Sequence, residues 1–130
     1  MTSQAQGGSA IKRLWQRLGT SDAQLEAEEL QASSREAGAI AISSCTDGQV
    51  VTVSGPLRSV ILKPVSGLPS VEAQIYDGSG QVTLLWMGRR RIAGIEPGRV
   101  LSATGRLSNC DGNRVIFNPR YALKPVHVSD

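Results

Sequence analysis

The stretch VEAQIYDGSGQVTLLWM, residues 71–87, indicates the fold class most directly. Apolar and polar side chains alternate before the turn sequence DGSG and again after it, which is the pattern of two antiparallel strands joined by a tight hairpin. We expect these strands at residues 71–76 and 81–87. Alternation assigns one set of side chains to the core face: Val71, Ala73 and Ile75 on the first strand, and Val82, Leu84 and Trp86 on the second.

Further strands are expected on both sides of this hairpin. Upstream, residues 49–63 form one long strand with a bend at Gly55-Pro56. The expected order downstream is a connector at residues 88–98, a strand at 99–109, a turn at 111–113 and a fifth strand at 114–118. A long, bent first strand and a longer connector between the third and fourth strands predict an all-β, five-stranded Greek-key barrel of the oligonucleotide/oligosaccharide-binding (OB) type. A five-stranded SH3-like barrel is the alternative.

A helical extension is expected before the barrel. Apolar side chains recur with helical spacing at four positions, Ile11, Leu14, Trp15 and Leu18. This stripe predicts packing on its own domain or on a sister subunit; a membrane surface or a partner protein is the less favoured alternative. A second helix is expected to start at Ser21 and to end before Gly38. The resulting division is disorder at residues 1–10, helices at 11–37, a barrel at 38–125 and a tail at 126–130.

Charge is unevenly distributed along the 130 residues, whose formal net charge is +3. Residues 1–37 contain four basic and five acidic residues, a net charge of −1, whereas residues 38–130 contain ten basic and six acidic residues, a net charge of +4. Eight of those ten cations are arginine, whose planar fork suits phosphate. A polyanionic partner is therefore worth considering beside the common role of charge in solubility.

Composition also limits the chemistry that we expect. The single histidine, His127, lies three residues from the end, so we expect no catalytic residues, no metal site and no cofactor. No run approaches the roughly 20 apolar residues that span a bilayer, and the first ten residues do not resemble a secretory signal. We therefore expect a cytosolic, non-enzymatic protein. Cys45 and Cys110 are then expected to be reduced thiols, although the barrel would bring them near enough for a disulfide to be the alternative.

Three segments together resemble a known family. They read VTVSGPLRSVILKP at residues 51–64, VEAQIYDGSGQVTLLWMGRRRIAGIEPGRVLSATGRL at 71–107 and NRVIFNPRYAL at 113–123. They resemble small bacterial OB-fold nucleic-acid-binding proteins, especially the compact actinobacterial ones. The central segment is also similar to the OB domains of tRNA-anticodon binding and of branch-migration helicase wedges.

This resemblance implies a ligand surface across the second and third strands, flanked by the loops after the first and fourth. Gln74, Tyr76, Thr83, Leu85 and Met87 would face the ligand, with Tyr76 as the best stacking residue. Arg89, Arg90 and Arg91 would form a phosphate clamp, with a solvated turn as the equal alternative. The nucleic-acid-binding residues that we expect are Arg58, Lys63, Gln74, Tyr76, Thr83, Arg89, Arg90, Arg91, Arg106, Arg114, Arg120 and Tyr121.

Aromatic residues are few, which bears on the strength of binding. We expect Trp86 in the core, Val115 and Phe117 as the inward pair of the last strand, and Tyr121 as either a barrel plug or an exposed platform. One or two stacking residues imply weak, salt-sensitive and sequence-tolerant binding of single-stranded DNA or RNA. The alternative is a protein-interaction or oligomerisation module that uses Leu85, Met87 and the Ile11–Leu18 stripe.

Overall fold

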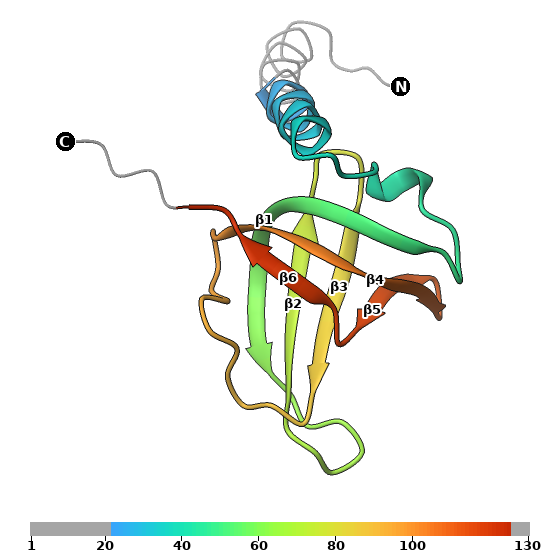
Figure 1. Ribbon diagram of the computed structural model, residues 1–130, viewed down its shortest axis with the longest axis vertical. Coiled ribbons are helices and arrows are strands. Elements are labelled where there is room, and N and C mark those ends of the chain that lie inside the picture. Colours follow the sequence, from blue (N-terminus) through green and yellow to red (C-terminus); the bar gives the residue numbers. More distant parts are fainter. Residues whose placement is uncertain (1–21, 126–130) are drawn as a thin grey trace, which may run out of the picture.

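The computed structural model describes residues 22–125 and is mostly β (Figure 1). A helix covers residues 22–36 of the described chain, in the region where the second helix was expected. A short 3-10 helix, η1, follows. The elements after that helix are η1 (Ile42–Ser44), β1 (Val50–Leu62), β2 (Ser70–Tyr76), β3 (Gln81–Met87), β4 (Val100–Cys110), β5 (Asn113–Phe117) and β6 (Arg120–Leu123).

The long strand β1 belongs to two parts of the sheet, and it changes partner at the expected bend. Its first half, Val50–Pro56, pairs with β4, and its second half, Leu57–Leu62, pairs with β2. At the bend, a Cβ atom on Gly55 would collide with the carbonyl oxygen of Tyr76, so only glycine fits there. Because β2 pairs with β3, β3 with β5 and β5 with β4, the pairings close into a circuit of five strands.

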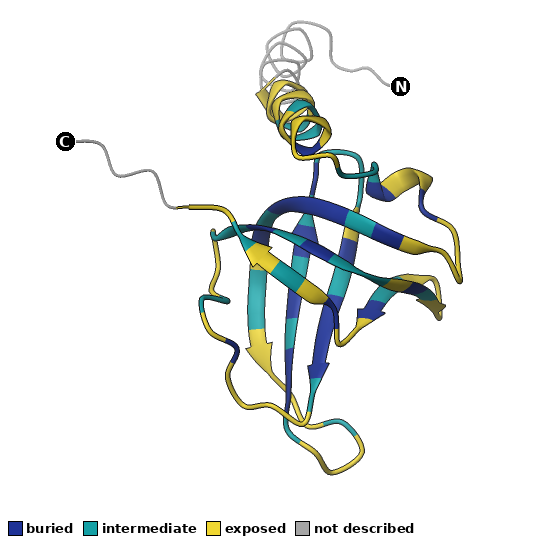
Figure 2. Cartoon of the chain, in the orientation of Figure 1, coloured by how far each residue is buried: buried dark blue, intermediate teal, exposed yellow. Residues whose placement is uncertain are grey.

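The core lies inside this circuit (Figure 2). All six side chains that alternation assigned to the core face of β2 and β3 are buried, and Trp86 donates a hydrogen bond from Nε1 to the carbonyl oxygen of Pro119 at 3.1 Å. In β5, the last predicted strand, the inward residues differ from the predicted ones. Ile116 is fully buried and Phe117 is 42% exposed, so the inward pair proposed from sequence was wrong.

The physical reason for this reversal is the register of β5. This strand runs parallel to β3, with Ile116 beside Leu84 and Phe117 beside Leu85. Leu84 belongs to the inward set of β3, so its neighbour Ile116 also points inward and Phe117 points outward. Three consecutive apolar residues, Val115 to Phe117, allow either choice until the neighbouring strand is known.

β6 was not predicted, because only four residues follow Pro119 before the chain leaves the sheet. It pairs with β4 and brings Tyr121 against the core, where its ring meets Trp86 edge to face at a centroid distance of 5.6 Å. The hydroxyl of Tyr121 donates to the carbonyl oxygen of Ala93 at 2.9 Å. This placement favours the plug over the exposed platform.

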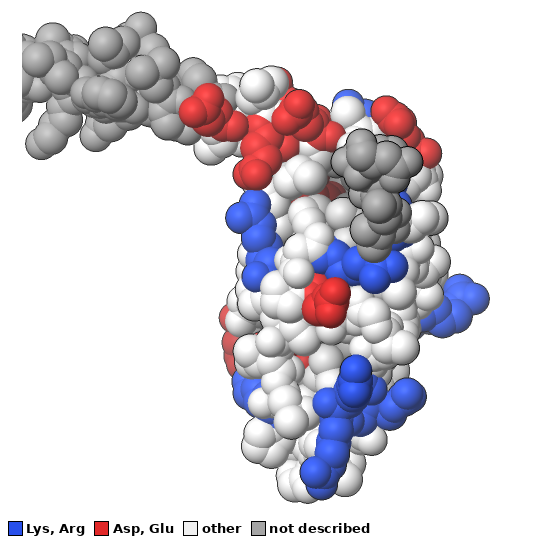
Figure 3. All heavy atoms as spheres, turned by 90° about the vertical axis from the view of Figure 1, so that its left-hand side faces the viewer, with Lys and Arg blue, Asp and Glu red and all other residues white. Residues whose placement is uncertain are grey.

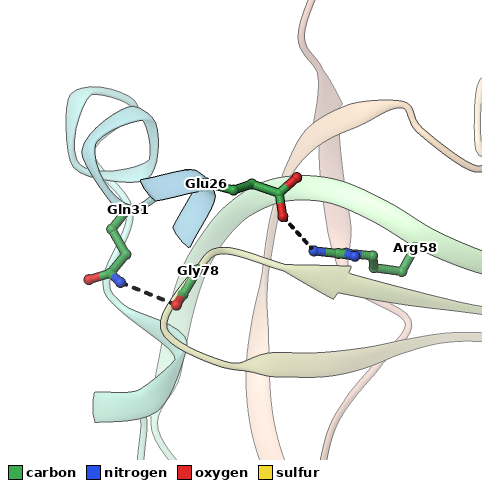
Figure 4. A network of polar contacts seen from close by, with 4 residues as sticks. All are labelled: Glu26, Gln31, Arg58 and Gly78. Carbon is green, nitrogen blue, oxygen red and sulfur yellow. Dashed lines mark hydrogen bonds and ion pairs between the residues drawn. The ribbon is translucent and has the colours of Figure 1, made fainter. Parts of the chain in front are cut away.

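The helix of residues 22–36 packs against the turn between β2 and β3. Gln31 donates from Nε2 to the carbonyl oxygen of Gly78 at 3.2 Å (Figure 4). A Cβ atom on Gly78 would collide with the backbone of Ala27. Next to Gly78, the fully buried Asp77 accepts hydrogen bonds from the backbone of Ile42, Ser79 and Gly80. The turn therefore holds both helical segments at one end of the sheet. Within residues 22–125, no helix is both long and apolar enough to cross a membrane.

Candidate functional site

A polar groove of about 370 Å³ lies on the outer face of β2 and β3. The register places Gln74 opposite Thr83, and Thr83 beside Val115 of β5. Strand alternation turns these side chains away from the core, since Ala73, Ile75, Val82 and Leu84 point inward. The lining residues are Lys63, Glu72, Gln74, Gln81, Thr83, Cys110, Asp111, Asn113, Arg114 and Val115. Four of the twelve expected binding residues thus meet in one groove: Lys63, Gln74, Thr83 and Arg114.

The formal charges of this groove balance. Its two cations, Lys63 and Arg114, are accompanied by two carboxylates, Glu72 and Asp111. The Lys63 ammonium lies 3.7 Å from Glu72 Oε1, and the Lys63 side chain remains 56% exposed. An exposed ion pair of this kind is weak, so Lys63 can exchange its partner for another anion at little cost. Neutral hydrogen-bonding groups, the amides of Gln74 and Gln81 among them, make up much of the remaining lining.

Arg58 and Tyr76 adjoin the groove but are already engaged. The Arg58 guanidinium lies 4.3 Å from the centroid of the Tyr76 ring, in a cation–π contact. Its Nη2 atom also lies 3.6 Å from Oε1 of Glu26 on the helix (Figure 4). Arg58 therefore covers one face of the ring that was expected to be the best stacking platform.

Arg89, Arg90 and Arg91 begin the connector directly after β3. All three are exposed, and within residues 22–125 none of them forms an ion pair. Gly88 donates a backbone hydrogen bond to Pro69 at 2.8 Å, so the start of the connector lies beside the loop between β1 and β2. In Figure 3, basic side chains gather at the lower end of the face shown, and acidic side chains gather at the upper end.

The other expected binding residues do not line the groove. Arg106 donates to the carbonyl oxygen of Gly48, and Arg120 lies on β6 opposite Thr104. Tyr121 packs on Trp86. On the expected ligand face itself, Leu85 is buried with only 7% of its surface exposed. The stripe of Ile11, Leu14, Trp15 and Leu18, on which the oligomerisation alternative depends, lies outside the described residues.

Phe117 is the outer-face residue that the sequence argument missed. Its ring follows Val115, a groove residue, by two positions on the same strand and therefore on the same face. If Ile116 is known to be inward, Phe117 must be outward. The inward position of Ile116 follows from the pairing of β5 with β3, which the sequence does not show. Ile61 of β1, 47% exposed, is a second apolar side chain on this face, in register with Glu72.

Both cysteines are free thiols, one buried and one exposed. Burial raises the pKa of Cys45, with a smaller lowering contribution from Arg114 and a raising one from Asp77. Cys110 lines the groove. Among the described residues, no three histidine, cysteine or carboxylate side chains lie together as a metal site would require.

A second cavity, of about 430 Å³, lies between the helix and the strands β1, β4 and β6. Small and apolar side chains dominate its lining, which includes Leu30, Gly55, Val100 and Leu123. It contains one cation, Lys124, and one carboxylate, Glu36. With a single cation and a single carboxylate in its lining, this cavity offers a polyanion fewer cations than the groove does.

No protein-family model matches the chain, and no curated protein sequence matches it. Several solved structures are similar in shape, among them the following two. One is described as "Structure of RecG bound to three-way DNA junction"; it is 23% identical over 60% of this chain and 11% of its own, with a TM-score of 0.48. The other is described as "Structural mimicry for functional antagonism"; it is 13% identical over 62% of this chain and 41% of its own, with a TM-score of 0.50. Each match spans less than half of the solved chain, and the second shows a shared fold alone.

Proposed function

We propose that this chain is a non-enzymatic OB-type barrel that binds single-stranded DNA or RNA weakly and with little sequence specificity. The observation that carries the proposal is the polar groove on β2 and β3, which contains Lys63 and Arg114 and lies on the strand that leads to Arg89, Arg90 and Arg91. Cations beside neutral hydrogen-bonding groups are the combination that a phosphate backbone with unpaired bases requires.

The strand order supports the OB-type assignment. A first strand shared between two parts of the sheet, a closed circuit of five strands and a long connector after the third strand are the features of that barrel. In such barrels, the face of the second and third strands and the loops beside it form the usual ligand surface. The groove of this chain lies on that face, between Lys63 and the turn that joins β4 to β5.

Electrostatics support a polyanionic ligand and also limit its affinity. Residues 38–125 contain ten basic and five acidic residues, a net charge of +5. One of the five carboxylates, that of Asp77, is buried and accepts backbone hydrogen bonds, so it adds no exposed acidic group to the surface. Within the groove, however, cations and carboxylates are equal in number, and the Tyr76 ring is partly covered. Weak binding with a strong dependence on salt follows.

Fluorescence anisotropy with labelled single-stranded oligonucleotides tests the proposal. The double variant Lys63→Gln/Arg114→Gln removes both groove cations, whereas Arg120→Gln removes a cation that does not line the groove. We expect the unsubstituted chain and Arg120→Gln to bind at low salt, and the groove variant to bind at least about tenfold more weakly. No binding by the unsubstituted chain at low salt, or equal losses in both variants, would contradict the proposal.

A further inference from the structure

Phe117 is the last residue of β5, and its exposed ring lies on the outer face of the sheet, the face that contains the groove. Pairing of β5 with β3 places it beside Leu85, and Leu85 lies opposite Glu72 of β2. The ring is 42% exposed, whereas Leu85 beside it is 7% exposed. Since Phe117 lies two residues beyond Val115, its side chain is about 7 Å further along the face than the groove wall. An aromatic ring therefore adjoins the groove without being part of its lining.

Cations lie on both sides of this ring along the sheet. Arg114, three residues earlier on β5, also lines the groove, although strand alternation puts it on the side of Ile116 rather than on that of Phe117. In the other direction, β3 continues past Leu85 to Met87 and then into Arg89, Arg90 and Arg91. The order along the face is thus groove, ring and exposed arginines. A bound single strand could keep its phosphates on the cations while one base lies on the ring.

The opposite end of the face is unfavourable for phosphate. There Arg58 already contacts Tyr76 and Glu26. Residues 22–36 of the helix contain five acidic residues and one basic residue, so phosphates near the turn between β2 and β3 meet a negative surface. Repulsion at this end favours an exit from the groove at the Phe117 end.

We infer that Phe117 is the base-stacking platform of this face, and that a bound single strand runs from the groove across Phe117 to Arg89, Arg90 and Arg91. This inference rests on the proposed function and adds the course of the ligand to it. Phe117, rather than Tyr76, is the aromatic residue whose ring accounts for most of the stacking energy. The contact reads no base edge, so it binds all four bases.

The test compares Phe117→Leu, which keeps an apolar side chain but removes the ring, with Phe117→Tyr, which keeps the ring. Val50→Ala is the matched control, because Val50 is also an exposed apolar residue at 58% and lies on the part of β1 that pairs with β4. Anisotropy with labelled oligo-dT at low salt gives the affinities. We expect Phe117→Leu to bind about five- to 150-fold more weakly, equivalent to about 1–3 kcal/mol, and both other variants to bind within about twofold of the unsubstituted chain.

A second measurement uses Phe117→Trp. Stacking of a base on the new indole should quench its emission when oligo-dT is added, beyond any change in the unsubstituted chain, which has Trp15 and Trp86. This readout reports contact with the ligand even if Phe117→Leu lowers stability.

The outcomes separate the inference from the proposed function. Oligonucleotide binding that is equal in Phe117→Leu and the unsubstituted chain overturns the inference and leaves the proposed function standing. A larger loss in Tyr76→Leu than in Phe117→Leu also overturns it. Light scattering that shows a dimer only when Phe117 is present, with unchanged oligonucleotide affinity, assigns the ring to a contact between copies and overturns it as well. If the unsubstituted chain binds no oligonucleotide at low salt, both the inference and the proposed function fail.

Discussion

Replacement of Arg89, Arg90 and Arg91 by glutamine should lower the salt dependence of oligonucleotide binding more than any other set of three substitutions. Each phosphate contact with a single strand contributes about −0.7 to the slope of log K against log salt concentration. The proposed path offers four cations without a carboxylate partner in the described part of the chain: the three connector arginines and Arg114. The expected slope is therefore about −3 for the unsubstituted chain and about −1 for the triple variant.

These slopes predict a large difference in a simple titration. A fourfold rise in salt concentration should weaken binding about 50-fold for the unsubstituted chain and about threefold for the triple variant. Fluorescence anisotropy at four or five salt concentrations measures both slopes. The control variant, Arg120→Gln/Lys124→Gln, removes two cations from β6 and the residue after it and should keep a slope near −3.

Two results would refute this reasoning. A triple variant that keeps the slope of the unsubstituted chain would show that the connector arginines contact no phosphate and are a solvated turn. A control variant that loses slope as strongly as the triple variant would show that binding follows overall charge rather than the face of β2 and β3.

Three further substitutions or treatments have defined outcomes. Glu26→Gln removes the carboxylate that pairs with Arg58, so oligonucleotide affinity at low salt should rise about two- to fivefold while stability changes by less than about 0.5 kcal/mol, as anisotropy and urea denaturation will show. Asp77→Ala removes a fully buried carboxylate that accepts three backbone hydrogen bonds and should lower the free energy of unfolding by about 2–5 kcal/mol; an unchanged urea midpoint would contradict this. A thiol reagent at about pH 8 should modify Cys110 first, because burial raises the pKa of Cys45 and lowers its thiolate fraction; equal rates, measured by mass spectrometry, would argue against that protection.

The main strands could be predicted because each contains its own signal. β3 has the predicted bounds, and the bend of β1 is marked by Gly55-Pro56, where the strand passes from one partner to another. β6 contains no comparable signal, since it is four residues long and pairs with β4 rather than with β5, the strand before it in the chain. Alternation divides the side chains of a strand between two faces. It does not show which face is inward when the side chains on both faces are apolar, as they are from Val115 to Phe117.

The candidate site could be predicted in part for the same reason. Gln74 and Thr83 belong to one hairpin, so their common face follows from counting residues, and the structure confirms it. The grouping of cations depends on pairings between distant strands. Arg120 and Arg114 are six residues apart, yet Arg114 lines the groove and Arg120 lies on β6 opposite Thr104. The number of arginines on one face of the sheet therefore cannot be obtained from composition alone. It also requires the register, which determines which strands share that face.

The register also determines which aromatic residue is available to a ligand. From sequence, Tyr76 was the available ring and Phe117 a core residue, whereas the structure covers one face of Tyr76 with Arg58 and exposes Phe117. The number of rings suited to stacking therefore remains about one, and the expectation of weak binding persists with a different residue responsible. Because a single stacked base contributes only about 1–3 kcal/mol, the remaining affinity must come from phosphate contacts. For that reason the salt slope, rather than the affinity at one salt concentration, is the quantity that distinguishes a ligand face from a merely basic surface.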